Sequence, residues 1–148
     1  MGFLHWWKSE ASNQEETASQ LDLISDSQAL APQRKRVDGV IVNKRFTRSI
    51  RDNGGAGDVF QRSVIEETRE LFDCNVNELY RETGGKKGRR DTLPQPVQEA
   101  YMVNESLAAN ELERQTGTIG GVSQDEVNDQ IVESVRQTSR NTRRWLPW

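Results

Sequence analysis

The strongest helical pattern in the chain lies at residues 92–115, which read TLPQPVQEAYMVNESLAANELERQ. Thr92 and Gln95 are spaced like a capping box, and two prolines fall in the first turn, where a missing N–H costs nothing. The apolar residues that follow recur mostly at intervals of three or four, as in an amphipathic helix. They are Val97, Ala100, Tyr101, Leu107, Ala108 and Leu112. The pattern predicts one long helix that points this face, with Tyr101 and Leu107, into a core.

Segments on both sides of this helix show the same periodicity. Phe46 and Ile50 are four residues apart, and Asn53 with two following glycines forms a helix stop signal. We expect further helices after Asp58, from Val76 to Thr83, and after Ser123. The last of these has a narrow apolar seam of Val127, Ile131, Val135, Thr138, Thr142 and Trp145. The sequence therefore predicts a mainly α fold, a small bundle of about four to five helices.

The N-terminal part of the chain has a different composition. Residues 8–36 are rich in Ser, Gln and Glu, and are too polar to offset the entropy lost on ordering. We expect residues 1–36 to be a flexible, disordered tail that starts with an aromatic segment, and residues 37–148 to form a single helical domain. The β-branched residues at the start of that domain also allow one short strand, from Gly39 to Asn43.

The residues needed for enzymatic chemistry are sparse. The chain has one cysteine, Cys74, and one histidine, His5, which would have to serve a catalytic triad from the expected tail. The same count leaves only scattered carboxylates for a metal. No nucleotide or cofactor fingerprint is present. We interpret Glu66, Glu67 and Glu70 as a solvent-facing acidic helix surface. The sequence therefore predicts a protein that is not an enzyme and has no metal and no cofactor.

The chain also lacks the features of membrane and secreted proteins. No apolar run approaches the roughly 20 residues that cross a bilayer, and the first residues do not have the pattern of a signal peptide. We expect a cytoplasmic protein without integral membrane association.

A basic turn precedes the long helix. Its cations stand among three glycines, which permit positive φ and close approach to a partner. They are Lys86, Lys87, Arg89 and Arg90, and Lys44, Arg45 and Arg48 form a second basic group. Such cations are suited to neutralising the phosphates of nucleic acid. The alternative is a solvated connection between helices. The first functional hypothesis is thus a non-enzymatic regulatory protein that contacts nucleic acid through the basic loop.

The two ends of the chain carry all four tryptophans. Trp6 and Trp7 lie at one end, and Trp145 and Trp148 lie at the other, beside Arg143 and Arg144. Exposed tryptophans are typical of interface centres. The second hypothesis is a helical adaptor or assembly protein that binds a protein partner, or a second copy of itself, through these ends and the last helix. Packing of the tryptophans onto the protein's own core is the other alternative.

Two segments carry a resemblance to a known group of proteins. They are LYRETGGKKGRRDTL at Leu79–Leu93 and ESLAANELE at Glu105–Glu113. Residues Leu79 to Thr116 resemble part of the DNA-damage-inducible protein D and BRO/KilA-type phage antirepressor group, in which a lysine-rich loop precedes a helix of this character. The resemblance implies a helical, non-enzymatic regulator associated with DNA damage or mobile elements, with Lys86 to Asp91 marking its interaction surface.

Overall fold

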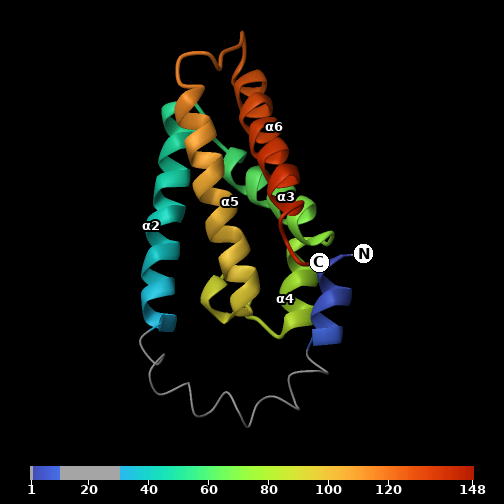
Figure 1. The fold of residues 1–148 in the computed structure, drawn as a ribbon. Coiled ribbons are helices and arrows are strands. Elements are labelled where there is room, and N and C mark those ends of the chain that lie inside the picture. The colour runs from blue at the N-terminus through green and yellow to red at the C-terminus, as the bar shows by residue number, and fades with distance from the viewer. Residues whose placement is uncertain (1, 11–30) are drawn as a thin grey trace.

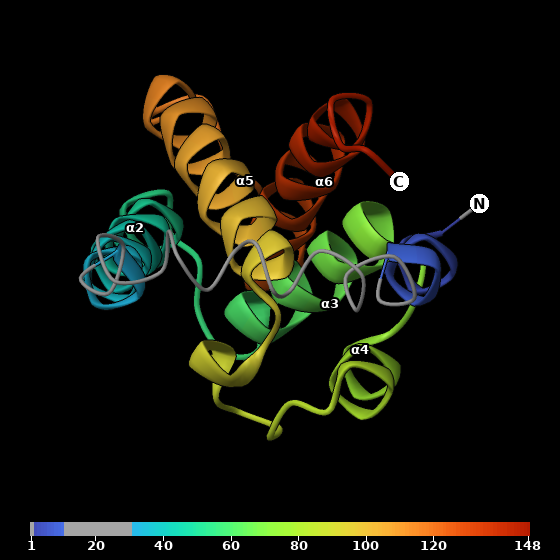
Figure 2. The same cartoon turned by 60° about the horizontal axis from the view of Figure 1, so that its bottom comes forward.

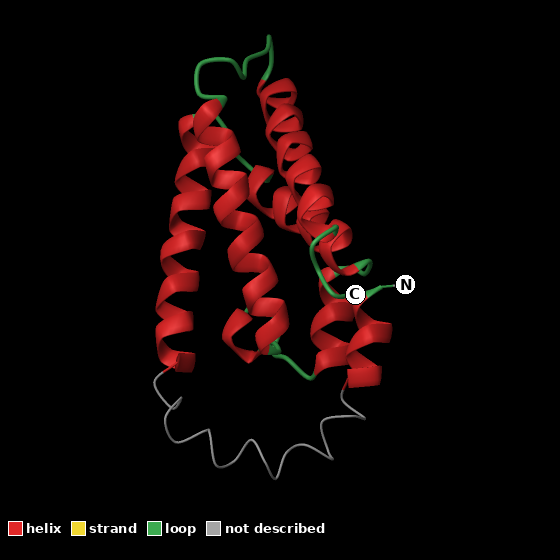
Figure 3. Cartoon of the chain, viewed as in Figure 1, coloured by secondary structure: helices red, strands yellow, loops and turns green. Residues whose placement is uncertain are grey.

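The computed structural model describes residues 2–10 and 31–148, and these residues are mainly helical (Figures 1 and 3). Residues 3–10 form a first helix. The others are α2 (Ala31–Asp52), α3 (Val59–Phe72), α4 (Val76–Thr83), a 3₁₀ turn η1 (Arg90–Thr92), α5 (Gln95–Arg114) and α6 (Gln124–Arg143). The predicted mainly α fold is confirmed, with more helical segments than expected.

The long helix α5 lies at the centre of the bundle. It packs against α2 on one side and α6 on the other, and α6 also packs against α3 (Figure 2). The first helix, residues 3–10, lies beside α4 at the lower end in Figure 1, where Lys8 Nζ is 3.4 Å from Glu82 Oε2. This arrangement gives the bundle two ends with separate cores.

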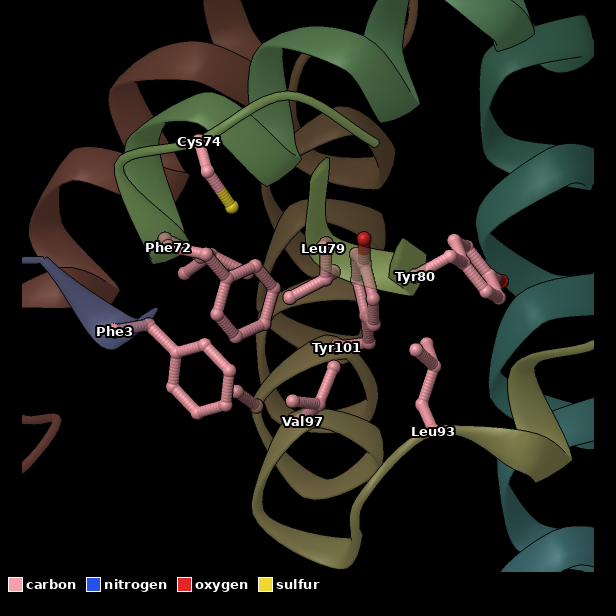
Figure 4. Packing of buried hydrophobic residues seen from close by; sticks show 10 residues of the cluster. Phe3, Phe72, Cys74, Leu79, Tyr80, Leu93, Val97 and Tyr101 are labelled. Atoms are coloured by element: carbon pink, nitrogen blue, oxygen red, sulfur yellow. The ribbon is translucent and has the colours of Figure 1, made fainter. Parts of the chain in front are cut away.

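The core at the upper end in Figure 1 is made by α2, α3, α5 and α6. Its buried residues include Phe46, Ile50, Leu112, Ile131 and Val135. The core at the lower end is more aromatic and joins the first helix to α3, α4 and α5 (Figure 4). Phe3, Phe72, Leu79, Val97 and Tyr101 are buried there. The apolar residues that recur at helical spacing in the sequence thus form two cores, one above the other in the same bundle.

Helix caps define several boundaries. The Asn75 side chain accepts a hydrogen bond from the Glu78 N–H at 2.8 Å and begins α4, which ends at Gly84 with φ of 76°. Ser123 caps α6 in the same way. Thr92 does not cap α5, because Pro94 occupies the N-cap position and makes no side-chain cap hydrogen bond. The predicted capping box at Thr92 is therefore wrong, and its hydroxyl serves the preceding loop instead.

The optional strand from Gly39 to Asn43 is also wrong, since these residues lie within α2 and no strand occurs in residues 2–10 or 31–148. The β preference of the valines is weaker than the helical packing of Phe46 and Ile50 against neighbouring helices. α2 begins at Ala31. The flexibility expected of residues 11–30 lies outside the described residues.

Leu107 does not point into the core. It is 46% exposed, whereas Tyr101 is 3% exposed as predicted. The buried face of α5 instead continues through Asn104 and Glu105, both fully or almost fully buried. Asn104 and Glu105 are thus buried on the face of α5 on which the apolar pattern predicts Leu107.

Candidate functional site

A cleft of about 1040 Å³ opens between α2, the basic loop of residues 84–93 and the first half of α5. Its lining includes three exposed cations, Lys44, Lys87 and Arg89. Its buried lining includes Tyr80, Tyr101 and Glu105. Residues that are far apart in sequence therefore contribute to one site.

The basic loop has a defined shape. Gly84 and Gly88 adopt φ of 76° and 83°, a region that favours glycine. A Cβ at Gly85 would lie 3.1 Å from both Leu93 and Tyr80 side chains, so the backbone sits close to the core. Thr92 Oγ1 accepts a hydrogen bond from the Lys86 N–H at 2.8 Å and is 2.6 Å from the Arg89 carbonyl, to which it donates. These hydrogen bonds of the Thr92 hydroxyl fix the backbone of the loop, and the side chains of Lys86 and Lys87 are exposed to solvent.

The predicted cations are distributed unevenly around this cleft. Lys44, Lys87, Arg89 and Arg90 line it. Lys86 is exposed on the same loop, and Arg48 is exposed one turn after Lys44 on α2. Arg45 lies on another face of α2 and forms an exposed ion pair with Glu113, at 2.8 Å. The hydrogen bond that Arg45 donates to Glu113 is the main cause of the raised pKa of Arg45. The structure thus brings four of the seven together.

Arg90 differs from its neighbours because its guanidinium turns inward. Nη1 lies 2.8 Å from both carboxylate oxygens of Glu105, with hydrogen-bond geometry to Oε1. Cζ lies 4.1 Å from the centroid of the Tyr101 ring, a cation–π contact. Burial by itself would lower the pKa of Arg90, but the charge and hydrogen bond of Glu105 raise it. Arg90 is therefore a positively charged anchor of the loop, already paired inside the protein.

The floor beneath this anchor contains a second carboxyl group. Glu67 on α3 is 0% exposed, so its interpretation as part of a solvent-facing acidic surface is wrong. Its Oε1 accepts a hydrogen bond from Asn104 Nδ2 at 3.0 Å, and the same amide nitrogen donates to Ser139 Oγ on α6 at 2.9 Å. Burial, followed by the charge of Glu105, raises the pKa of Glu67 well above its ordinary value.

Further hydrogen bonds connect the cluster to α2 and α3. Asn43 Nδ2 donates to Glu105 Oε1 at 3.1 Å. The Tyr101 hydroxyl is 2.6 Å from Thr68 Oγ1, which itself donates to the Val64 carbonyl at 2.7 Å. Because the threonine proton is used, the tyrosine is the donor of this pair. Burial is the main cause of the raised pKa of Tyr101. Four helices and the loop therefore meet at one polar cluster.

The sequence contained a signal for this cluster. Glu67 lies between Val64 and Leu71 at spacings of three and four, and Glu105 falls between Tyr101 and Ala108 in the same manner. A charged residue on an apolar helical face is a candidate for burial with a partner.

The aromatic ends of the chain lie together. The ring centroids of Phe3 and Trp148 are 4.8 Å apart, those of Trp6 and Trp148 are 5.1 Å apart, and Trp148 Nε1 donates to the Leu71 carbonyl at 2.7 Å. Trp7 is partly buried against the same core. The Arg143 guanidinium donates to the Trp148 carbonyl.

Trp145 and Arg144 are different. Arg144 is exposed and Trp145 is 88% exposed. Trp145 lines a second groove, also of about 1040 Å³, between α5 and α6 with Leu107 and Ile119. Of the predicted partner-binding aromatic residues, this is the one that leaves most of its surface in water.

Two broader observations concern the described residues as a whole. No three of their His, Cys, Asp and Glu side chains gather in a way that could hold a metal ion. No helix among them has both the length and the apolar character to cross a membrane. Comparisons with protein-family models, with curated proteins and with solved structures found no match to this chain.

Proposed function

We propose that this chain is a cytoplasmic, non-enzymatic regulatory protein that contacts nucleic acid at the basic cleft. Lys44, Lys86, Lys87 and Arg89 are the residues that contact phosphates. The observation that carries the proposal is the convergence of exposed cations from α2 and the loop on one cleft. A nucleic acid supplies several phosphates for several cations at once, which a single small anion does not.

The geometry favours contact with the nucleic-acid backbone over reading of bases. Tyr80 and Tyr101 line the cleft but are 7% and 3% exposed, so their rings cannot stack on bases without rearrangement. Lysine side chains on a loop make phosphate contacts that carry little sequence information. We therefore expect modest sequence selectivity and a steep dependence of affinity on salt.

Arg90 has a positioning role in this proposal. Its charge is matched by Glu105 inside the protein, so it does not neutralise a phosphate. It holds the loop against α5, and the neighbouring Lys86, Lys87 and Arg89 remain outside. Arg45 is similarly engaged with Glu113, and Arg48 extends the basic face of α2.

The resemblance of residues Leu79 to Thr116 to the antirepressor group supports the same class of function. The segment contains the basic loop together with Arg90 and Glu105, so the resemblance covers both the proposed contacts and their anchor. A regulator associated with DNA damage or mobile elements is the context that it favours.

The test is a matched pair of triple variants. The cleft variant changes Lys44, Lys87 and Arg89 to Gln, and the control changes Arg51, Arg114 and Arg140, which are exposed on other surfaces. Both lose three positive charges, so their net charges are equal. Binding to duplex and single-stranded DNA and RNA is measured by fluorescence anisotropy at several salt concentrations. The cleft variant should lose affinity and should flatten the logarithmic salt dependence by about 0.9 for each lost contact with duplex DNA.

The comparison shows whether binding depends on the position of the cations in the cleft or only on the net charge of the protein. Equal losses in the two variants would mean that only the net charge matters. Absence of binding by the unmodified protein at low salt would remove the proposal.

A second candidate function is an adaptor that binds a protein partner or a second copy of itself. The 88% exposure of Trp145 beside the groove between α5 and α6 favours it, since tryptophan is enriched at interface centres. Trp6, Trp7 and Trp148 contribute less than the sequence predicts, because they pack against the protein's own core. In this function Arg144 and Trp145 are the contact residues.

A further inference from the structure

The charged groups of the buried cluster do not balance if all are ionised. Glu67 on α3 and Glu105 on α5 face Arg90 of the loop. The described polar side chains around them include six neutral ones: Asn43 from α2, Thr68 from α3, Tyr80 from α4, Tyr101 and Asn104 from α5, and Ser139 from α6. The charge of Asp91, next to Arg90 in the loop, acts on Tyr80. Two carboxylates and one guanidinium would leave an unpaired negative charge in the interior, which is strongly unfavourable.

The hydrogen bonds give a second indication. Glu67 Oε2 and Glu105 Oε2 are both buried and neither accepts a hydrogen bond. Both carboxyl groups face the same guanidinium, Glu67 Oε2 at 3.9 Å from Arg90 Nη2 and Glu105 Oε2 at 2.8 Å from Arg90 Nη1. A proton on Glu67 removes the unpaired charge and turns its Oε2 from an unsatisfied acceptor into a donor. Arg90 approaches Glu105 at 2.8 Å but Glu67 only at 3.9 Å, which places the negative charge on Glu105.

We propose that Glu67 and Glu105 share one proton, and that this proton makes their cluster with Arg90 a pH-dependent latch for the basic loop. With the proton present, Arg90 faces one carboxylate and holds the loop against α5. When Glu67 loses the proton, one guanidinium faces two carboxylates and the latch is weakened. The proposal concerns the folded chain itself and does not depend on what the cleft binds.

The direction of the pH effect follows from proton linkage. Between about 4.5, the ordinary pKa of a glutamate, and the raised pKa of Glu67, the folded state holds a proton that the unfolded state has released. As pH rises through this range, the unfolding equilibrium constant increases by up to about tenfold per pH unit. Below the range both states are protonated, and above it both are ionised, so the effect levels off.

The decisive variant is Glu67→Gln, which has the shape of the protonated acid and carries no charge at any pH. Chemical denaturation of the full chain is measured from acidic to alkaline pH. The variant should match the unmodified protein in acid and become progressively more stable than it as pH rises. The control is Glu66→Gln on α3, a half-buried glutamate that pairs with Arg69 and lies outside the cluster, and it should run parallel to the unmodified protein. A Glu67→Gln protein that stays parallel at every pH, or that does not fold, overturns the proposal.

A second measurement uses the unmodified protein. In a titration of ¹³C-labelled glutamate carboxyl groups by NMR, one resonance should titrate well above all the others. It should disappear in Glu67→Gln and move to lower pH in Glu105→Gln, because the neighbouring negative charge is gone. If every glutamate titrates in the ordinary range, no proton is shared and the latch does not exist.

Discussion

The two ends of the bundle bury polar groups in different ways. At the upper end the buried amides are neutral: Asn53 Nδ2 donates to the Leu112 carbonyl at 2.8 Å, and Asn128 Nδ2 donates to the Ala56 carbonyl at 2.9 Å. At the level of the middle of α5, two buried carboxyl groups, Glu67 of α3 and Glu105 of α5, face the half-buried Arg90 of the loop. Neutral amides tie loops to helices at any pH, whereas an ion cluster makes its stabilisation depend on protonation and on every partner being present.

The largest expected effect comes from removing the cation of this cluster. Arg90→Ala leaves Glu105 without its ion pair and removes the contacts that hold the loop against α5. We expect a loss of about 3–5 kcal/mol of unfolding free energy, the range for breaking a buried pair, measured by urea denaturation at neutral pH.

Arg89→Ala is the matched control for Arg90. Arg89 is exposed and pairs with Asp91 at 3.2 Å, so its loss should cost less than about 1 kcal/mol. Equal effects of the two changes would show that the buried cluster has no special role in stability.

In the upper core, the loss of side-chain volume should strongly reduce the free energy of unfolding, and this reduction should not depend on pH. Leu112 is 0% exposed in the upper core, so Leu112→Ala should cost about 2–5 kcal/mol. Leu107→Ala, on the exposed side of the same helix, should cost less than about 1 kcal/mol. Thermal and urea unfolding of the two variants tests the face of α5 directly, and a reversed order would contradict the observed orientation of Leu107.

The smallest expected difference within a pair of variants concerns the two tryptophans of the C-terminus. Trp148→Ala removes a half-buried ring and its hydrogen bond to the Leu71 carbonyl, and should cost about 2 kcal/mol. Trp145→Ala should leave stability unchanged, because the ring is in solvent. Sedimentation and binding measurements on the same two proteins test the adaptor function, in which Trp145→Ala weakens association. If neither change affects association, Trp145 is not a contact residue.

Much of the fold could be predicted because it depends on local periodicity. The spacing of Phe46 and Ile50, and of Val127, Ile131 and Val135, places each group on one helical face without knowledge of the neighbours. Leu107 was predicted wrongly because an apolar residue at the edge of a helical face has no defined partner in the sequence. Its exposure depends on where α2 and α6 lie relative to α5.

The candidate site could be predicted only in part. The glycines and cations of residues 84–90 identify a basic loop, but they do not distinguish Lys87, which is exposed, from Arg90, which turns inward. That distinction requires Glu105 beneath the loop. Glu67 presents the same difficulty, since adjacent glutamates in one acidic segment differ in burial.

The amino-acid sequence by itself determined the helical class, the basic loop before α5 and the scarcity of catalytic and metal-binding side chains, because these follow from composition and from spacings within a few residues. Only the tertiary structure decided that Lys44 joins the loop cations at one cleft, that the two aromatic ends meet on Phe72, and that Glu67, Glu105 and Arg90 form one cluster. Each of these depends on segments distant in sequence. The charged and aromatic side chains of these segments find their partners, and so contribute to stability, only when the helices pack together.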